Sequence, residues 1–108
     1  MKVVFNADDF GYSKAVNYGI IEAFKSGVVR STSILVTTPY FDHAVNLYNE
    51  YKDLGLGVGI HLNLMMGKPL CDGLDTLVDA NGNFYKHMLF DSSKNHLGML
   101  VAVATLAV

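Results

Sequence analysis

The sequence predicts an α/β fold in which parallel strands alternate with helices. Short apolar segments alternate with longer segments whose apolar residues recur at helical spacing, and Gly, Pro or Asp residues separate them over residues 3–64. This strand–helix rhythm is typical of a parallel sheet. The chain has 108 residues, of which 51% are hydrophobic and 17% are charged, so the composition favours one compact domain over a disordered segment.

The first predicted strand runs directly into the first predicted helix. Residues 3–7 are β-branched and aromatic enough for a short buried strand. Residues 14–26 carry an apolar stripe at helical spacing, with Ser13 in position for the N-cap and Gly27 for the residue just past the helix. The two elements form the first strand–helix unit.

Two further strands and a second helix follow. Residues 28–38 are predicted to form a strand, strongest over residues 34–36, which Pro39 ends. Residues 41–52 form an amphipathic helix, and residues 58–64 form the third strand.

The last third of the chain does not continue the alternation of strands and helices. Residues 77–85 resemble a small hairpin around an Asn-Gly pair. Residues 97–108 are almost wholly apolar, yet a membrane span needs about 20 such residues, so we expect this segment to be buried against a partner. We therefore describe residues 1–108 as a single partial α/β domain.

Charge and cysteine content limit the classes of partner. Eight basic and ten acidic side chains give a net charge of −2, and no cluster of Lys or Arg is present. Neither nucleic acid nor a membrane is therefore an expected partner. Cys71 is the only cysteine, which excludes an internal disulfide, and the apolar run at the N-terminus is too short for a signal peptide. We expect a cytoplasmic protein.

Polar, ligand-capable residues lie near the ends of two predicted strands. Asp8 and Asp9 follow the first strand, and His61 and Asn63 lie near the end of the third. Active sites of parallel α/β proteins gather at the carboxyl ends of the strands. One carboxylate can bind a metal ion while its neighbour acts as a general base, and an imidazole can supply a second ligand. Because adjacent strand residues point in opposite directions, both carboxylates reach one site only if the chain turns there, as Gly11 allows.

Structural roles compete with this interpretation. A pair of Asp residues before a helix also complements the helix dipole, and a single His on a strand is often only hydrogen-bonded. For His43, His87 and His96 we favour such structural roles, and Cys71 lacks a nearby cationic partner that would activate it.

Three groups of residues resemble the YdjC-like carbohydrate deacetylases. These are NADDFG at residues 6–11, NYGI at residues 17–20, and GIHLNL at residues 59–64 followed by Gly67-Lys68-Pro69. The resemblance covers about residues 1–90, and residues 91–108 diverge into the apolar tail. It implies a modified (β/α) barrel, of which this chain would be the first part, and removal of acetyl groups from N-acetylated sugars of the chitooligosaccharide type.

The resemblance also implies roles for individual residues. It makes Asp9 and His61 ligands of a divalent metal ion and Asp8 the catalytic base, although the two carboxylates could exchange roles. Asn63 and Lys68 are placed as substrate-binding residues by position alone. The family suggests Mg²⁺, and Zn²⁺ or Mn²⁺ suits the same ligands.

The chain departs from the family pattern in ways that leave two functions open. A closed (β/α) barrel needs about 250 residues, and the second metal-binding His of the family has no counterpart in its local motif here. We expect either a deacetylase, truncated and inactive or completed by another chain in a homo-oligomer, or a non-catalytic fragment that binds at most a metal or a sugar. A premature stop after a frameshift would produce this combination.

Overall fold

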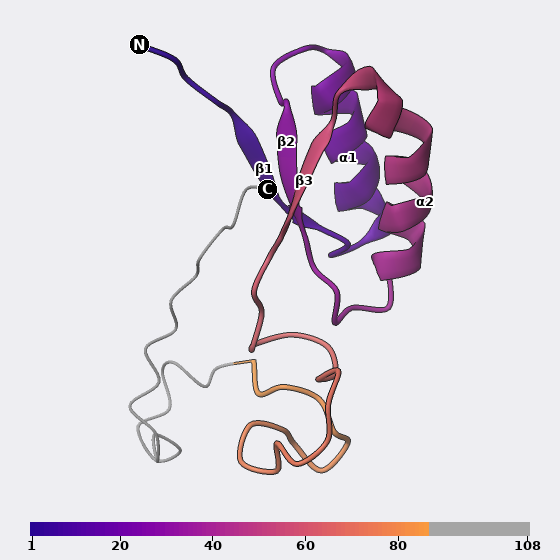
Figure 1. Ribbon diagram of the computed structural model, residues 1–108. Coiled ribbons are helices and arrows are strands. Elements are labelled where there is room, and N and C mark those ends of the chain that lie inside the picture. Colours follow the sequence, from indigo (N-terminus) through magenta and orange to yellow (C-terminus); the bar gives the residue numbers. More distant parts are fainter. Residues whose placement is uncertain (87–108) are drawn as a thin grey trace.

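The computed structural model describes residues 1–86 and contains one open, three-stranded parallel sheet with two helices (Figure 1). The strand order is β1-β2-β3, and both strand pairs are parallel. The elements are β1 (Asn6–Phe10), α1 (Lys14–Lys25), β2 (Ser31–Ile34), α2 (Phe41–Tyr51), the 3-10 helix η1 (Lys52–Leu54) and β3 (Gly57–Ile60). The predicted α/β class with parallel strands is confirmed.

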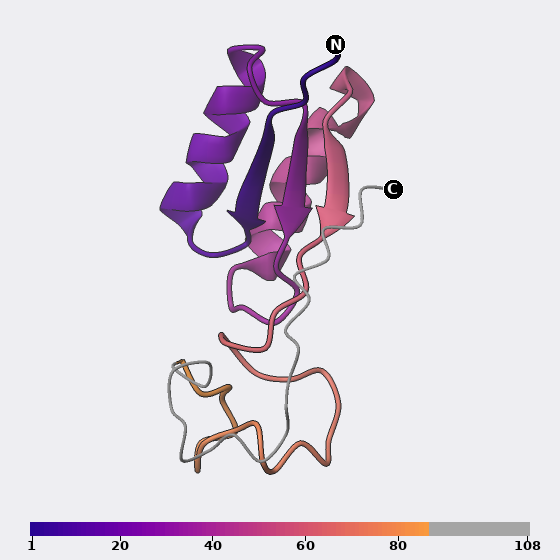
Figure 2. The same ribbon diagram turned by 90° about the vertical axis from the view of Figure 1, so that its left-hand side faces the viewer.

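Both helices pack on the same face of the sheet, and no described helix covers the other face (Figures 1 and 2). The side chains between the helices and the sheet form an apolar core. Its buried members are Phe10, Ile20, Ile21, Phe24, Ile34, Ala44 and Leu56.

The face of the sheet that lies opposite the helices is polar. Ala7 and Val58 pack against the core, and both lie at the level of Thr32 in the ladder. The residues that alternate with them face away from the helices because strand side chains alternate. Asn6 and Ser31 pair at this face. The sheet therefore separates an apolar side, which stabilises the fold, from a polar side, which no described helix covers.

The helices follow the sequence signals closely. The side chain of Ser13 accepts a hydrogen bond from the backbone N–H of Val16, at 3.1 Å, and caps α1 as predicted. Gly27 has a φ of 86°, the left-handed conformation expected just past a helix. The second predicted helix, residues 41–52, corresponds to α2 and the start of η1.

The predicted strand boundaries were wrong, although the three strands exist. Residues 3–5 are exposed, and the strand predicted at residues 3–7 instead begins at Asn6, where the ladder with Ser31 begins. The strand predicted at residues 28–38 is limited to β2, and the one predicted at residues 58–64 ends at Ile60. A strand extends only as far as its neighbours pair with it, and apolar composition does not report that length.

The loop of residues 61–86 lies beyond the carboxyl ends of the strands (Figure 2). It is docked at Thr37, whose carbonyl accepts from the N–H of Lys68 at 3.1 Å and whose hydroxyl donates to the carbonyl of Met66 at 2.9 Å. Val78 and Phe84 form a single antiparallel bridge around the predicted Asn-Gly turn. The hairpin prediction is confirmed in this short form.

The remaining predictions about the last third concern residues beyond the described range. The apolar segment 97–108, His87 and His96 all lie outside residues 1–86. Among the helices of the described part, none is long and apolar enough to cross a membrane.

Gly67 provides a test of how the loop docks. Its φ is 76°, and a Cβ added there would lie 1.7 Å from the carbonyl oxygen of Thr37. We expect Gly67→Ala to undock the loop, because left-handed strain of about 1–2 kcal/mol adds to a steric clash of about 1–3 kcal/mol. Hydrogen exchange should show lost protection of the Lys68 amide.

Gly73→Ala is the matched control for this variant. Gly73 has a φ of 82° but open space around the position of a Cβ, so the variant carries the strain without the clash. Equal protection of the Lys68 amide in both variants would contradict the docking role of Gly67.

Candidate active site

The predicted site residues Asp9 and His61 come together at the carboxyl end of the sheet. The Oδ1 atom of Asp9 lies 3.3 Å from Nδ1 of His61, and the backbone N–H of Asp9 points to the same nitrogen at 3.4 Å. Asp9 belongs to β1, and His61 belongs to the segment after β3. Because β2 lies between these two strands, their backbones are about 10 Å apart across the sheet. His61 is held there because its backbone N–H donates to the carbonyl of Ile34, at 2.9 Å.

β1 contains a register shift at its two adjacent carboxylates, Asp8 and Asp9. Ala7 pairs with Thr32 and Phe10 with Ile34, so a step of three residues in β1 is matched by a step of two in β2. Such a bulge breaks the alternation of side chains and re-aims them, and bulges are common beside active sites. Gly11 was the residue expected to turn the chain, whereas the re-aiming begins earlier, within β1.

Asp9 has the backbone conformation that this shift requires. Its φ is 68°, and among the described residues it is the only one other than glycine with a positive φ. Its carbonyl accepts from the N–H of Tyr12, at 2.9 Å. Gly11 follows with a φ of 101°, and a Cβ there would lie 2.8 Å from the carbonyl oxygen of Leu35. Asp9 and Gly11 together turn the chain from β1 into α1.

Asp8 is held by two hydrogen bonds to one of its oxygens. Its Oδ1 atom accepts from the hydroxyl of Ser33, at 2.6 Å, and from the side-chain amide of Asn6, at 2.8 Å. Its Oδ2 atom makes none of the hydrogen bonds found within residues 1–86. The carboxylate is thus oriented with one oxygen held and the other available.

Sequence reasoning missed Ser33. This residue is fully buried in the middle strand, and its hydroxyl contacts Asp8 across the β1–β2 ladder. The sequence did contain one sign of its role. Ser31 and Ser33 lie two positions apart in β2, so both side chains face the same side of the central strand.

The separation of Asp9 and His61 fits joint binding of a divalent cation. Two ligands that bind one ion at about 2.0–2.2 Å, with an angle of about 90–110° between them, lie about 2.8–3.6 Å apart. The two side chains are 52% and 17% exposed respectively, so an ion can reach them from solvent. Within the described range, no group of three or more His, Cys, Asp or Glu residues converges on one point. Residues 1–86 therefore bring together only two candidate ligands, Asp9 and His61.

Asn63 and Lys68, the predicted substrate-binding residues, lie in the loop beyond the sheet. The amide nitrogen of Asn63 donates to the hydroxyl of Thr37 and to the carbonyl of Met66, both at 2.6 Å. Its Oδ1 atom accepts from the N–H of Met65, at 3.0 Å. Asn63 thus fixes the loop. Lys68 is exposed, and the substrate roles of both residues stay predictions.

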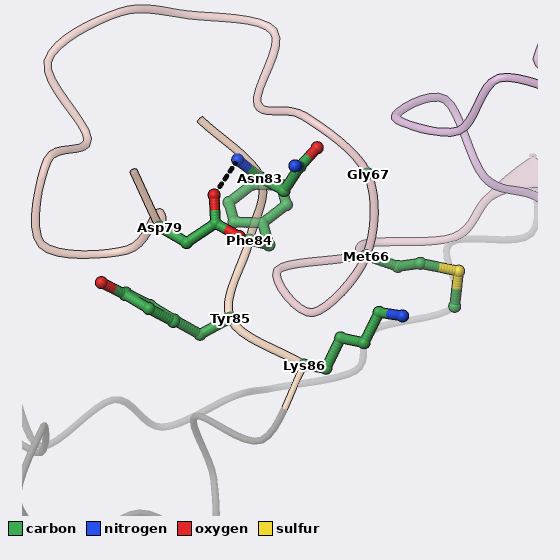
Figure 3. A pocket seen from close by; sticks show the side chains of 7 residues that line it. All are labelled: Met66, Gly67, Asp79, Asn83, Phe84, Tyr85 and Lys86. Atoms are coloured by element: carbon green, nitrogen blue, oxygen red, sulfur yellow. Dashed lines mark hydrogen bonds between the residues drawn. The ribbon is translucent and has the colours of Figure 1, made fainter. Parts of the chain in front are cut away.

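The same loop contains a hollow of about 470 Å³ (Figure 3). Asp79 braces it, because its Oδ1 atom accepts from the backbone N–H of Asn83, at 3.0 Å. The lining residues are Met66, Gly67, Asp79, Asn83, Phe84, Tyr85 and Lys86. Asp8, Asp9 and His61 are absent from this lining. We centre the candidate site on those three residues and not on the hollow.

The fold and the site define a class: an α/β protein with a carboxylate pair and a histidine at the carboxyl ends of parallel strands. Comparison with known proteins gives the family. The model of the YdjC-like protein family matches residues 2–104, and the chain belongs to this family.

The relatives include named carbohydrate deacetylases. Carbohydrate deacetylase 2 of Listeria innocua is 52% identical over 86 residues, which cover 80% of this chain and 34% of that protein. Carbohydrate deacetylase of Clostridium beijerinckii is 53% identical over 87 residues, which cover 81% of this chain and 35% of that protein. The chain spans about a third of the length of the curated relatives it matches.

A solved structure supports the fold. A protein from Enterococcus faecalis V583, for which cellobiose-phosphate cleavage has been suggested, matches with a TM-score of 0.66 and 41% sequence identity. The match covers 81% of this chain and 34% of that protein.

The left-handed conformation of Asp9 leads to a stability prediction. We expect Asp9→Asn to change the free energy of unfolding by no more than about 0.5 kcal/mol, because Asn tolerates a positive φ. Asp9→Ala should cost about 1–2 kcal/mol more, because its Cβ is strained there without a compensating polar side chain. Urea denaturation followed by circular dichroism measures both.

Asp53→Ala is the control, since Asp53 is exposed and lies outside the positive-φ region. Equal stabilities for Asp9→Asn and Asp9→Ala would show that the backbone at Asp9 is unstrained.

Proposed function

We propose that this chain supplies metal-binding and proton-accepting groups for the removal of acetyl groups from N-acetylated sugars of the chitooligosaccharide type. The observation that carries the proposal is the meeting of Asp9 and His61, and the neighbouring residue Asp8 is held by Ser33. About half of the aligned residues are identical to those of the two carbohydrate deacetylases, which supports the same chemistry.

We assign Asp9 and His61 to a divalent cation. Carboxylate oxygen suits Mg²⁺ and Mn²⁺, and imidazole suits Zn²⁺, so this donor pair accepts any of the three, with Mg²⁺ as the ion that the family resemblance suggests. When bound, the cation would supply Lewis-acid activation of the acetamide carbonyl and of the attacking water.

Asp8 is assigned as the general base. Its Oδ1 atom is held by Ser33 and Asn6, which leaves Oδ2 to accept a proton from the water that attacks the carbonyl carbon. The contacts favour this assignment over the exchanged one, because the short approach to His61 is made by Asp9. A ligand must share the cation with His61, whereas a base must keep one oxygen free.

The pair of ligands supplied by residues 1–86 supports two forms of this function. In one, a second copy of the chain or residues outside the described range complete the ligand set, and the protein is a deacetylase. In the other, the chain is a non-catalytic fragment that binds a metal or a sugar weakly, and the absence of a third converging ligand among the described residues favours this alternative.

Metal binding separates the two carboxylates. We expect isothermal titration with Mn²⁺ to show binding that Asp9→Asn and His61→Ala weaken by at least about tenfold, because each removes a ligand. Asp8→Asn should bind Mn²⁺ much like the unmodified chain. Asp53→Asn serves as the control for loss of a surface carboxylate. If Asp8→Asn lost binding while Asp9→Asn kept it, the two roles would be exchanged.

Catalysis gives the second test. Acetate release from a di-N-acetylated disaccharide should depend on added metal and should fall by about 10²–10⁴-fold in Asp8→Asn, because general-base catalysis contributes on that scale. Acetate release that survives both chelation and His61→Ala would refute the proposal. Metal binding without acetate release from the unmodified chain would select the non-catalytic alternative.

A further inference from the structure

Asn17 is a fully buried polar residue in α1 that joins three segments of the chain. Its Oδ1 atom accepts from the backbone N–H of Gly11, at 2.6 Å. Its Nδ2 atom donates to the carbonyl of Tyr40, at 3.4 Å, and lies 2.9 Å from Nδ1 of His43. A buried amide whose atoms are all occupied in this way is costly to disturb.

The neighbours of Asn17 fix the orientation of its amide. The N–H of Gly11 requires an acceptor and the carbonyl of Tyr40 requires a donor, so the oxygen faces Gly11 and the nitrogen faces α2. The second hydrogen on Nδ2 then points to His43, whose Nδ1 atom must accept it. His43 therefore carries its hydrogen on Nε2, with Tyr18 packed edge-on against the ring at 5.0 Å between centroids.

The Gly11 peptide that Asn17 holds is the end of the turn that carries the carboxylates. The carbonyl of Gly11 accepts from the hydroxyl of Thr38, so both sides of this residue are tied to the segments behind it. The preceding carbonyl, of Phe10, accepts from the N–H of Leu35 at 2.7 Å. The backbone at Phe10 and Gly11, directly after Asp9, is thereby fixed by α1 and by the chain that follows β2.

We propose that Asn17 is a positioning residue of the active site, which sets the separation of Asp9 and His61 by holding the Gly11 peptide in register with the packing of α1 against α2. The proposal depends on the assigned function only for the importance of that separation. Asn17 touches neither carboxylate, and it acts through the backbone two residues beyond Asp9.

The unmodified chain offers the first test. Long-range ¹H–¹⁵N spectra of the histidine side chains should show an unprotonated Nδ1 and a protonated Nε2 for His43. A neutral His43 that carries its hydrogen on Nδ1 would mean that the amide of Asn17 is reversed and cannot accept from Gly11. That result would overturn the proposal without any variant.

Substitution of Asn17 gives the second test. Asn17→Leu removes the acceptor, and we expect it to shift the amide resonance of Asp9 and the Nδ1 resonance of His61 and to weaken Mn²⁺ binding by about 10–100-fold. Asn17→Asp keeps an oxygen facing Gly11 and should restore the Asp9 resonance and most of the affinity. In that variant the hydrogen of His43 should move to Nδ1, since its partner has become an acceptor.

Val29→Ala controls for a general loss of stability, because Val29 is buried just before β2, at the amino end of the sheet. Unchanged Asp9 and His61 resonances in folded Asn17→Leu, or the same shifts in Val29→Ala, would refute the positioning role. If the unmodified chain fails to bind Mn²⁺, the proposed function fails, while the resonances of Asp9 and His61 still decide the role of Asn17.

Discussion

The register shift within β1 is the constraint on which the rest of the site depends. Two carboxylates adjacent in sequence would point to opposite faces of a regular strand, and one of them would enter the apolar core. Regular alternation from Ala7 already places Asp8 on the polar face beside Ser33. One extra residue in β1 relative to β2 lets Asp9 reach His61 while Phe10 enters the core. The backbone of Asp9 enters the left-handed region to make this possible, at a cost of about 1–2 kcal/mol that the surrounding fold must offset.

The fold offsets that strain through contacts made behind the turn. Behind it, the amide of Asn17 and the hydroxyl of Thr38 hold the Gly11 peptide, and the apolar side of the sheet buries Phe10 completely. The apolar face and the polar face of the sheet are therefore coupled. Packing of the helices on the apolar face holds the backbone of the turn, and the turn holds the carboxylates on the polar face. A strained residue persists only where its neighbours determine its conformation in this way.

The sequence predicted those features that depend on neighbours along the chain. The helix start at Ser13 and the stop at Gly27 were correct because caps and left-handed glycines are local signals. Strand boundaries failed because a ladder ends where its partner ends, and that length is a property of the pair. The meeting of Asp9 and His61 was expected from their place at strand ends. The bulge in β1 was not expected, because Asp8 and Asp9 are the same residue type and the sequence does not show which of them has the left-handed backbone. Ser33 escaped notice because its importance arises only from its register with Asp8.

The local origin of the site explains how a chain that spans about a third of its relatives can hold this part of it. Asp9 and His61 are separated by 52 residues in sequence, yet the described contacts that place them come from β2, from the segments that follow β1 and β2, and from α1. Their separation requires no closed barrel, because His61 is fixed by the carbonyl of Ile34 in the central strand and Asp9 by the turn after β1. What a fuller ligand set would add is affinity for the ion and exclusion of water, both of which depend on groups that surround the site. The geometry of these two candidate ligands is thus separable from the strength of any metal binding, and in this fold it is the geometry that β1, β2 and β3 determine.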